Sequence, residues 1–175
     1  MATIQKKTVL ITGCSAGGIG WALAKCFQRK GFHVFATARD TSKAEDLAEL
    51  SDVEVLQLDV ADTASISQCK DIVTQRTGGR LDVLINNAGV EFVSPLLDVD
   101  IAKSKKLFDV NVWGPLAMVQ AFAPLLIEAK GVISNHTSIS CVLPLVWSGA
   151  FHPPPPLPPP SLSPEEKGKQ FGTNT

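Results

Sequence analysis

The chain of 175 residues contains no tyrosine. Chemistry that depends on a phenol hydroxyl as proton donor or nucleophile is therefore excluded. Charge of one sign is lacking too, since 16 basic and 17 acidic residues give a formal net charge of −1. This balance provides no overall attraction to nucleic acid or to an anionic membrane, so any phosphate must be bound by a local site.

Paired cysteines and clustered histidines are also lacking. The four cysteines contain no Cys-x-x-Cys pair, which predicts free buried thiols in a reducing compartment. The three histidines show no metal-ligand spacing, so no metal site is expected. The N-terminus shows no signal peptide, and we expect no apolar stretch long enough to span a bilayer. A cytoplasmic protein without a transmembrane segment is therefore expected.

Proline is sparse up to Ala150 and abundant after it. Eight of the twelve prolines lie between Pro153 and Pro164. A run such as PPPPLPPP predicts polyproline II or disorder, because it can form neither a helix nor a central strand. We therefore predict a domain over residues 1–150 and a disordered proline-rich tail over 151–175. The tail is either a ligand for proline-reading domains or a solvated segment without a partner.

Before that boundary, strand-like runs alternate with amphipathic helical stretches. The alternation predicts an α/β fold with a Rossmann-type doubly wound parallel sheet and right-handed crossovers. Pro115 and Pro124 fall inside the longest helix, where each must occupy a kink or a first turn. The predicted strands cover residues 8–11, 33–38, 53–58 and 81–85, and a fifth strand begins at 132. The predicted helices cover 42–50 and 101–129, and two more run from 19 to a break at 31 and from 63 to a break at 78.

A glycine-rich segment, Thr12-Gly13-Cys14-Ser15-Ala16-Gly17-Gly18-Ile19-Gly20, follows the first strand and opens the first helix. Glycines let the backbone approach a pyrophosphate, and a helix N-terminus supplies free N–H groups and a favourable dipole. The alternative is merely a tight turn. The strand before it and the helix after it favour a dinucleotide site.

Further motifs follow in order: Leu58-Asp59-Val60, Asn86-Asn87-Ala88-Gly89, and Asn111 within NVWGP. With the glycine segment they resemble the short-chain dehydrogenase/reductase family over about residues 6–150. The glycine motif is one residue longer than the family's usual TGxxxGIG. The wording TGCSAGGIGWALA with FATARD is most similar to fungal NADPH-dependent acyl-dihydroxyacetone-phosphate reductases. This resemblance implies a small or lipid-like carbonyl substrate, and association with the endoplasmic reticulum or lipid droplets.

The resemblance also implies which residues bind the dinucleotide. Asp59 and Val60 would border the adenine, and Asn87 to Gly89 the ribose side, while turn chemistry alone is the alternative for the paired asparagines. The complete implied set is Gly13, Ser15, Gly17, Gly18, Ile19, Gly20, Thr37, Arg39, Asp59, Val60, Asn86, Asn87, Ala88 and Gly89.

The end of the second strand favours NADP(H) over NAD(H). An arginine suits a ribose 2′-phosphate, whereas an acidic residue would bind the free 2′-hydroxyl. The family's acidic position corresponds to Ala38, and Arg39 matches the arginine of NADP-dependent members. Strand alternation sends Arg39 and Asp40 in opposite directions. In the alternative, Arg39 is a surface residue paired with Asp40 or Glu45.

The family's catalysis, by resemblance, uses an asparagine, a serine, a tyrosine and a lysine. Asn111 matches the asparagine, and Ser138 matches the serine, with Ser140 as second choice. The tyrosine position, thirteen residues after Ser138, is occupied by Phe151, and the lysine position by Pro155. Phe151 has no exchangeable proton and Pro155 has no charge. Because general acid catalysis contributes about 10²- to 10⁴-fold in rate, we expect negligible turnover.

Three functions stand open. The first is an NADP(H)-dependent carbonyl reductase, which is the function by descent. The second is a non-catalytic NADP(H)-binding module, and the third is a truncated gene product that is marginally folded. Family members continue beyond the fifth strand, so we expect a C-terminally truncated sheet of about five strands. Its last strand would then be an exposed edge. The oligomeric state stays open.

Overall fold

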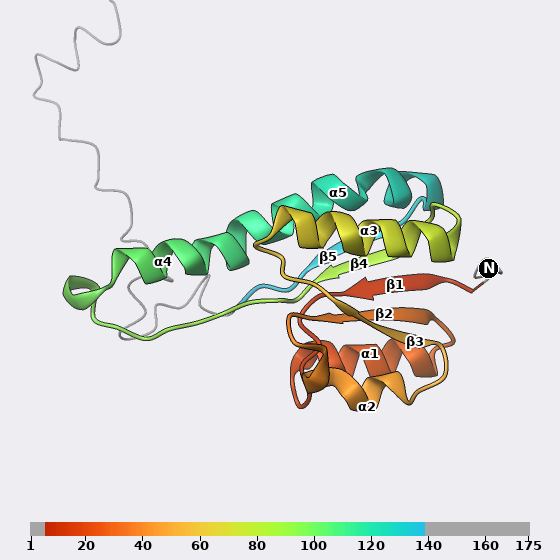
Figure 1. Ribbon diagram of the computed structural model, residues 1–175, viewed down its shortest axis with the longest axis horizontal. Coiled ribbons are helices and arrows are strands. Elements are labelled where there is room, and N and C mark those ends of the chain that lie inside the picture. The colour runs from red at the N-terminus through yellow and green to blue at the C-terminus, as the bar shows by residue number, and fades with distance from the viewer. Residues whose placement is uncertain (1–5, 139–175) are drawn as a thin grey trace, which may run out of the picture.

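The computed structural model describes residues 6–138, which form a five-stranded sheet with helices on both faces (Figure 1). The strand order is β3-β2-β1-β4-β5, and every pairing is parallel. This arrangement confirms the Rossmann-type prediction. The predicted boundary at residue 150 and the tail lie outside the described residues.

The strands lie within about two residues of their predicted bounds. Runs of apolar and β-branched residues account for this agreement, since such runs suit strands buried on both faces. The strands are β1 (Thr8–Ile11), β2 (His33–Ala38), β3 (Val53–Gln57), β4 (Val83–Asn86) and β5 (Val132–Asn135).

The connecting helices also follow the prediction, with one exception. The expected helix over 42–50 is a 3-10 turn followed by a single helical turn, because Ala44 between them leaves the helical conformation, with φ −132° and ψ 16°. The helices are α1 (Ile19–Arg29), η1 (Thr41–Ala44), α2 (Glu45–Ala48), α3 (Thr63–Thr77), η2 (Leu96–Asp98), α4 (Ile101–Phe108), η3 (Asp109–Trp113) and α5 (Gly114–Ala129).

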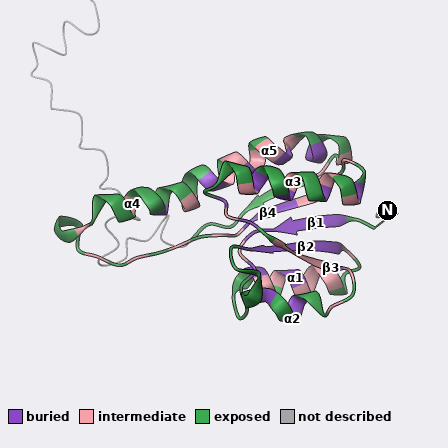
Figure 2. Ribbon diagram, viewed as in Figure 1, coloured by how far each residue is buried: buried purple, intermediate pink, exposed green. Residues whose placement is uncertain are grey.

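The central strands are buried (Figure 2). Their alternate residues supply two apolar layers. Leu10, Phe35 and Leu84 belong to the layer that includes α3 and α5. Val9 and Val34 belong to the layer that includes α1 and α2. This period of two follows from the strand geometry, and it places both layers around β1 and β2.

The stretch α4–η3–α5 is a continuous helical segment over Ile101–Ala129. η3 is a π-helical turn, and it ends beside Pro115, which occupies the first turn of α5 as predicted. By length and composition alone this segment is apolar enough to cross a membrane, so the prediction that no such stretch exists was wrong. Met118 and Phe122 of α5 are nevertheless fully buried against the sheet, as in the core helix of a globular protein.

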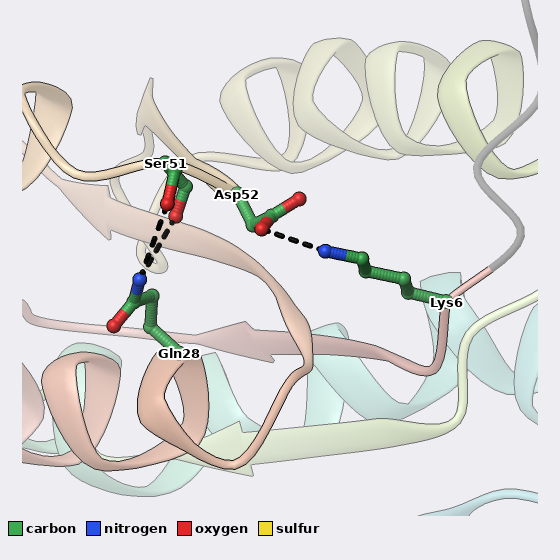
Figure 3. Close-up of polar contacts among 4 residues, drawn as sticks. All are labelled: Lys6, Gln28, Ser51 and Asp52. Carbon is green, nitrogen blue, oxygen red and sulfur yellow. Dashed lines mark hydrogen bonds and ion pairs between the residues drawn. The ribbon is translucent and has the colours of Figure 1, made fainter.

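Polar contacts fasten the chain at the amino ends of the strands (Figure 3). The Lys6 ammonium lies 2.7 Å from a carboxylate oxygen of Asp52, and this hydrogen bond lowers the pKa of Asp52. Gln28 of α1 donates from its amide to the backbone carbonyl of Ser51 at 3.2 Å. These contacts hold the turn before β3, where Asp52 has a left-handed φ of 64°. They lie at the amino ends of the strands, away from the carboxyl ends where a ligand would bind.

Candidate functional site

The predicted dinucleotide residues lie at or follow the carboxyl ends of β1, β2, β3 and β4. Parallel strands present these ends at one edge of the sheet, which is where ligands bind in open α/β folds. The segment between β1 and α1 lies against the segment that follows β4, because Gly13 is in contact distance of Ala88.

Gly13 of the first loop and Gly20 in the first turn of α1 are required by close packing. A Cβ on Gly13 would lie 2.8 Å from Cα of Ala88, and Gly13 has φ +74°. A Cβ on Gly20 would lie 2.5 Å from the Gly13 carbonyl oxygen and 2.6 Å from the Asn87 amide nitrogen. Any larger residue would push the loop away from Asn87-Ala88.

The additional residue of the glycine motif is accommodated in a turn. Gly18 donates its N–H to the Ser15 carbonyl at 3.0 Å, and Gly17 has φ +75° with open space around its Cβ position. The Ala16 N–H donates to the Lys43 carbonyl at 2.7 Å. The longer loop is therefore fixed to η1.

The N-terminus of α1 carries no side-chain cap. Its N-cap residue is Gly18, in an extended conformation, and the first turn contains no acidic residue. The first N–H groups of a helix have no intrahelical acceptor. Together with the helix dipole they form a site suited to a phosphate.

Thr12 joins β1 to the motif after β4. Its hydroxyl accepts the N–H groups of Asn87 at 2.9 Å and Ala88 at 2.8 Å, and lies 3.4 Å from the Ile85 carbonyl, to which it donates. Thr12 is buried. The sequence predictions assigned it no role, although a hydroxyl residue directly before the glycines was the available signal.

The two asparagines after β4 reach in different directions. Asn86 is buried and donates from Nδ2 to Oδ1 of Asn135 at 2.9 Å, at the end of β5. Asn87 donates from Nδ2 to the carbonyl oxygens of Thr12 at 2.8 Å and Gly13 at 3.1 Å. Both side chains hold segments of the site together, which goes beyond turn chemistry.

Asn111, the predicted catalytic asparagine, lies in the π-helical turn η3. Its Nδ2 donates to the Val90 carbonyl at 2.8 Å, and its Oδ1 accepts the Val90 N–H at 2.9 Å. Gly89 passes close by, since a Cβ there would lie 3.5 Å from Oδ1 of Asn111. The side chain therefore fixes the backbone just after the Asn86–Gly89 motif.

Arg39 lies at the end of β2 beside a hollow. The hollow has a volume of about 340 Å³, and the residues lining it are Arg39, Gln57, Asp59, Asp62, Ala64, Ser65 and Gln68. Arg39 is exposed and forms no ion pair with another described residue, so the alternative pairing with Asp40 or Glu45 is not observed. The guanidinium is available to a ligand at this edge.

Asp40 is engaged within its own turn. Its carboxylate accepts the Ser42 hydroxyl at 2.6 Å and the Ser42 N–H at 3.1 Å. The hydroxyl hydrogen bond from Ser42 is the main reason why the pKa of Asp40 is lowered. The carboxylate therefore serves as the cap of η1.

Thr37 and Val60 occupy supporting positions. The Thr37 hydroxyl is buried and donates to the Ile11 carbonyl at 3.2 Å, and the Thr37 carbonyl accepts the Cys14 N–H at 2.8 Å. Val60 is buried against Gly114, where a Cβ would lie 2.9 Å from Cγ2 of Val60. Their proposed contacts with a cofactor stay predictions.

The catalytic positions are only partly described. Ser138 is exposed and follows β5 by three residues. Ser140, Phe151 and Pro155 lie outside the described residues. The structure thus brings together the glycine loop, the Asn86–Gly89 motif and Asn111. The loss of the tyrosine and lysine functions stays a prediction.

Three comparisons bear on this site. Residues 7–151 match the family model described as short chain dehydrogenase. The short-chain dehydrogenase cctT of Talaromyces islandicus is 50% identical over 145 residues, which are 83% of this chain and 51% of that protein. The NADPH-dependent 1-acyldihydroxyacetone phosphate reductase of Schizosaccharomyces pombe is 42% identical over 147 residues, or 84% of this chain and 49% of the relative. The chain spans about half the length of these curated relatives.

Solved structures agree with the fold. A metagenomic short-chain oxidoreductase in complex with NADP matches with a TM-score of 0.76 and 33% identity, covering 83% of this chain and 68% of that one. An alcohol dehydrogenase from Thermococcus sibiricus, complexed with 5-hydroxy-NADP, matches with a TM-score of 0.77 and 27% identity, covering 83% and 63%.

Proposed function

Because the chain belongs to the short-chain dehydrogenase family of oxidoreductases, we propose that it binds NADP(H) at the carboxyl edge of its sheet. The uncapped N-terminus of α1 would hold the pyrophosphate, and Arg39 would hold the 2′-phosphate beside the hollow. NADPH bound there would be positioned by these residues and is a hydride donor to carbonyl carbons in its general chemistry. We also propose that the protein is located in the cytoplasm.

The observation that carries the NADP(H) preference is the different use of Arg39 and Asp40. Arg39 is exposed at the hollow, whereas the carboxylate of Asp40 accepts two hydrogen bonds from Ser42. An arginine pairs with phosphate through two parallel hydrogen bonds. The two carboxylates that line the hollow, those of Asp59 and Asp62, already accept the backbone N–H groups of Ala61 and Ala64. Three of the relatives and structural neighbours carry NADP or NADPH in their names, which supports the same choice.

The experiment is an equilibrium titration of the full chain with NADPH and with NADH. Arg39→Ala should weaken NADPH binding about 10- to 100-fold, because a charged hydrogen bond contributes about 1.5–3 kcal/mol. NADH binding should stay within twofold. Arg29→Ala, at the other end of α1, is the matched control. Equal losses for both nucleotides in Arg39→Ala would contradict the proposal.

The substrate class proposed is a lipid-like ketone, on the model of the acyl-dihydroxyacetone phosphate reductase named above. We propose that this chain alone does not turn it over, since it has no tyrosine to donate a proton. NADPH oxidation with an acyl ketone would contradict this. Cofactor-dependent thermal stabilisation without turnover supports a binding module, and the absence of cooperative unfolding supports a marginally folded product.

A further inference from the structure

We infer that His136 is a positioning residue for the dinucleotide-binding loop, acting through the side chain of Asn87; the inference rests on the proposed function. His136 directly follows β5, and the sequence predictions gave it no role. Its Nδ1 lies 2.9 Å from Oδ1 of Asn87. Its backbone N–H donates to the Asn86 carbonyl at 2.8 Å, so it continues the pairing of β5 with β4.

The orientation of the Asn87 amide follows from its other partners. Its nitrogen faces two backbone carbonyls, those of Thr12 and Gly13, at 2.8 and 3.1 Å. Carbonyl oxygens only accept, so the atom facing them must be the NH₂ group. The amide oxygen therefore faces His136, and no flipped arrangement satisfies both carbonyls.

The protonation of the histidine ring follows in turn. The Asn87 oxygen is an acceptor, so Nδ1 of His136 must carry a hydrogen. In the uncharged ring Nε2 then holds the lone pair. Free imidazole side chains in water prefer the opposite tautomer, with the hydrogen on Nε2. The contact with Asn87 thus selects the less common neutral form.

A chain of hydrogen bonds connects the end of β5 to the loop after β1. It runs from His136 to Asn87 and from Asn87 to the carbonyls of Thr12 and Gly13. Gly13 is the residue with φ +74° that packs on Ala88. By holding the Asn87 amide in place, His136 stabilises the loop conformation in which the α1 N-terminus is presented to a phosphate.

The test compares two substitutions of nearly equal shape. Asparagine in His136→Asn retains a donor nitrogen near the Nδ1 position, whereas His136→Leu has none, and neither side chain is charged. Because a neutral hydrogen bond contributes about tenfold or less, we expect His136→Leu to weaken NADPH binding roughly fivefold. His136→Asn should stay within twofold of the unchanged chain. Urea unfolding of both variants checks that each remains folded, as expected for an exposed residue.

A second measurement is independent of the cofactor. Nitrogen-15 NMR of the uncharged His136 ring should show the hydrogen on Nδ1, a signature that a merely packed surface histidine would not give. The Nε2–H tautomer, or equal NADPH affinities for the asparagine and leucine variants, overturns the inference. If the unchanged chain fails to bind NADPH, the proposed function fails, and the tautomer still decides whether His136 holds Asn87.

Discussion

β2 and β5 are both parallel strands of one sheet, yet their surroundings are opposite. All six residues of β2 are buried, between β1 and β3 and between helices on both faces. All four residues of β5 are exposed, and β4 is its only neighbour among the described strands. Hydrogen bonding thus makes both segments strands, whereas burial depends on what lies next to them.

The exposed strand β5 nevertheless leads into part of the site. Asn135 at its end binds Asn86, and the next residue, His136, binds Asn87. The buried strand β1 leads into Thr12 and the glycine loop, whose positions depend on tight packing. The buried strands therefore set the framework, and the exposed strand contributes polar contacts at its carboxyl end.

The largest expected difference between the two strands is in core truncation. Phe35→Ala in β2 should lower the free energy of unfolding by about 3–5 kcal/mol, because the ring is fully buried. Ile133→Ala in β5 should cost about 1 kcal/mol or less, since that side chain is 41% exposed. Urea unfolding of both variants measures the difference. Similar losses would show that β5 is covered in solution.

An intermediate effect is expected where β5 begins. A Cβ on Gly131 would lie 2.6 Å from the Leu81 carbonyl oxygen and 2.7 Å from that of Asp82. Gly131→Ala should therefore cost about 1–3 kcal/mol through overpacking against backbone. Hydrogen exchange should rise in β5 and stay slow in β1 and β2. Val132→Ala, at the next and exposed position, is the control, and faster exchange throughout the sheet would contradict a local effect.

The last expected effect, whose size depends on the pH, concerns the two layers of the core. Burial raises the pKa of Cys14 and of Cys69 from 9.0 to about 12. The unfolded thiols ionise near pH 9 and the folded ones do not, so the stabilisation is complete below pH 9 and is lost as the pH rises towards 12. Each thiol should reduce the free energy of unfolding by about 1.4 kcal/mol per pH unit in that window.

Urea unfolding at several pH values between 8 and 10.5 checks this dependence. Cys14→Ala tests the layer of α1 and α2, and Cys69→Ala tests the layer of α3 and α5. Each substitution should remove about half of the thiol-dependent slope. A slope that neither substitution changes would assign the alkaline loss of stability to other groups.

Local sequence patterns were sufficient for most elements and for several site residues. The apolar runs of β1 and β2, the glycines before α1 and the proline in the first turn of α5 are short-range signals with direct physical meaning. The split of the predicted helix over 42–50 was missed, because it occurs at Ala44, which is fully buried in the core and has a non-helical backbone. The helix over 101–129 was predicted, but its membrane-spanning length and apolar character were not, because the charged residues of its first turns conceal the apolar remainder.

The sequence by itself determined the alternation of strands and helices, the glycine-rich segment before the first helix and the absence of a tyrosine. Each of these is a property of neighbouring residues or of composition. Only the tertiary structure decided that Thr12 accepts hydrogen bonds from Asn87, 75 positions away, and that His136 contacts the same Asn87 from β5. Such contacts depend on strand order and register, which bring distant residues to one edge of the sheet.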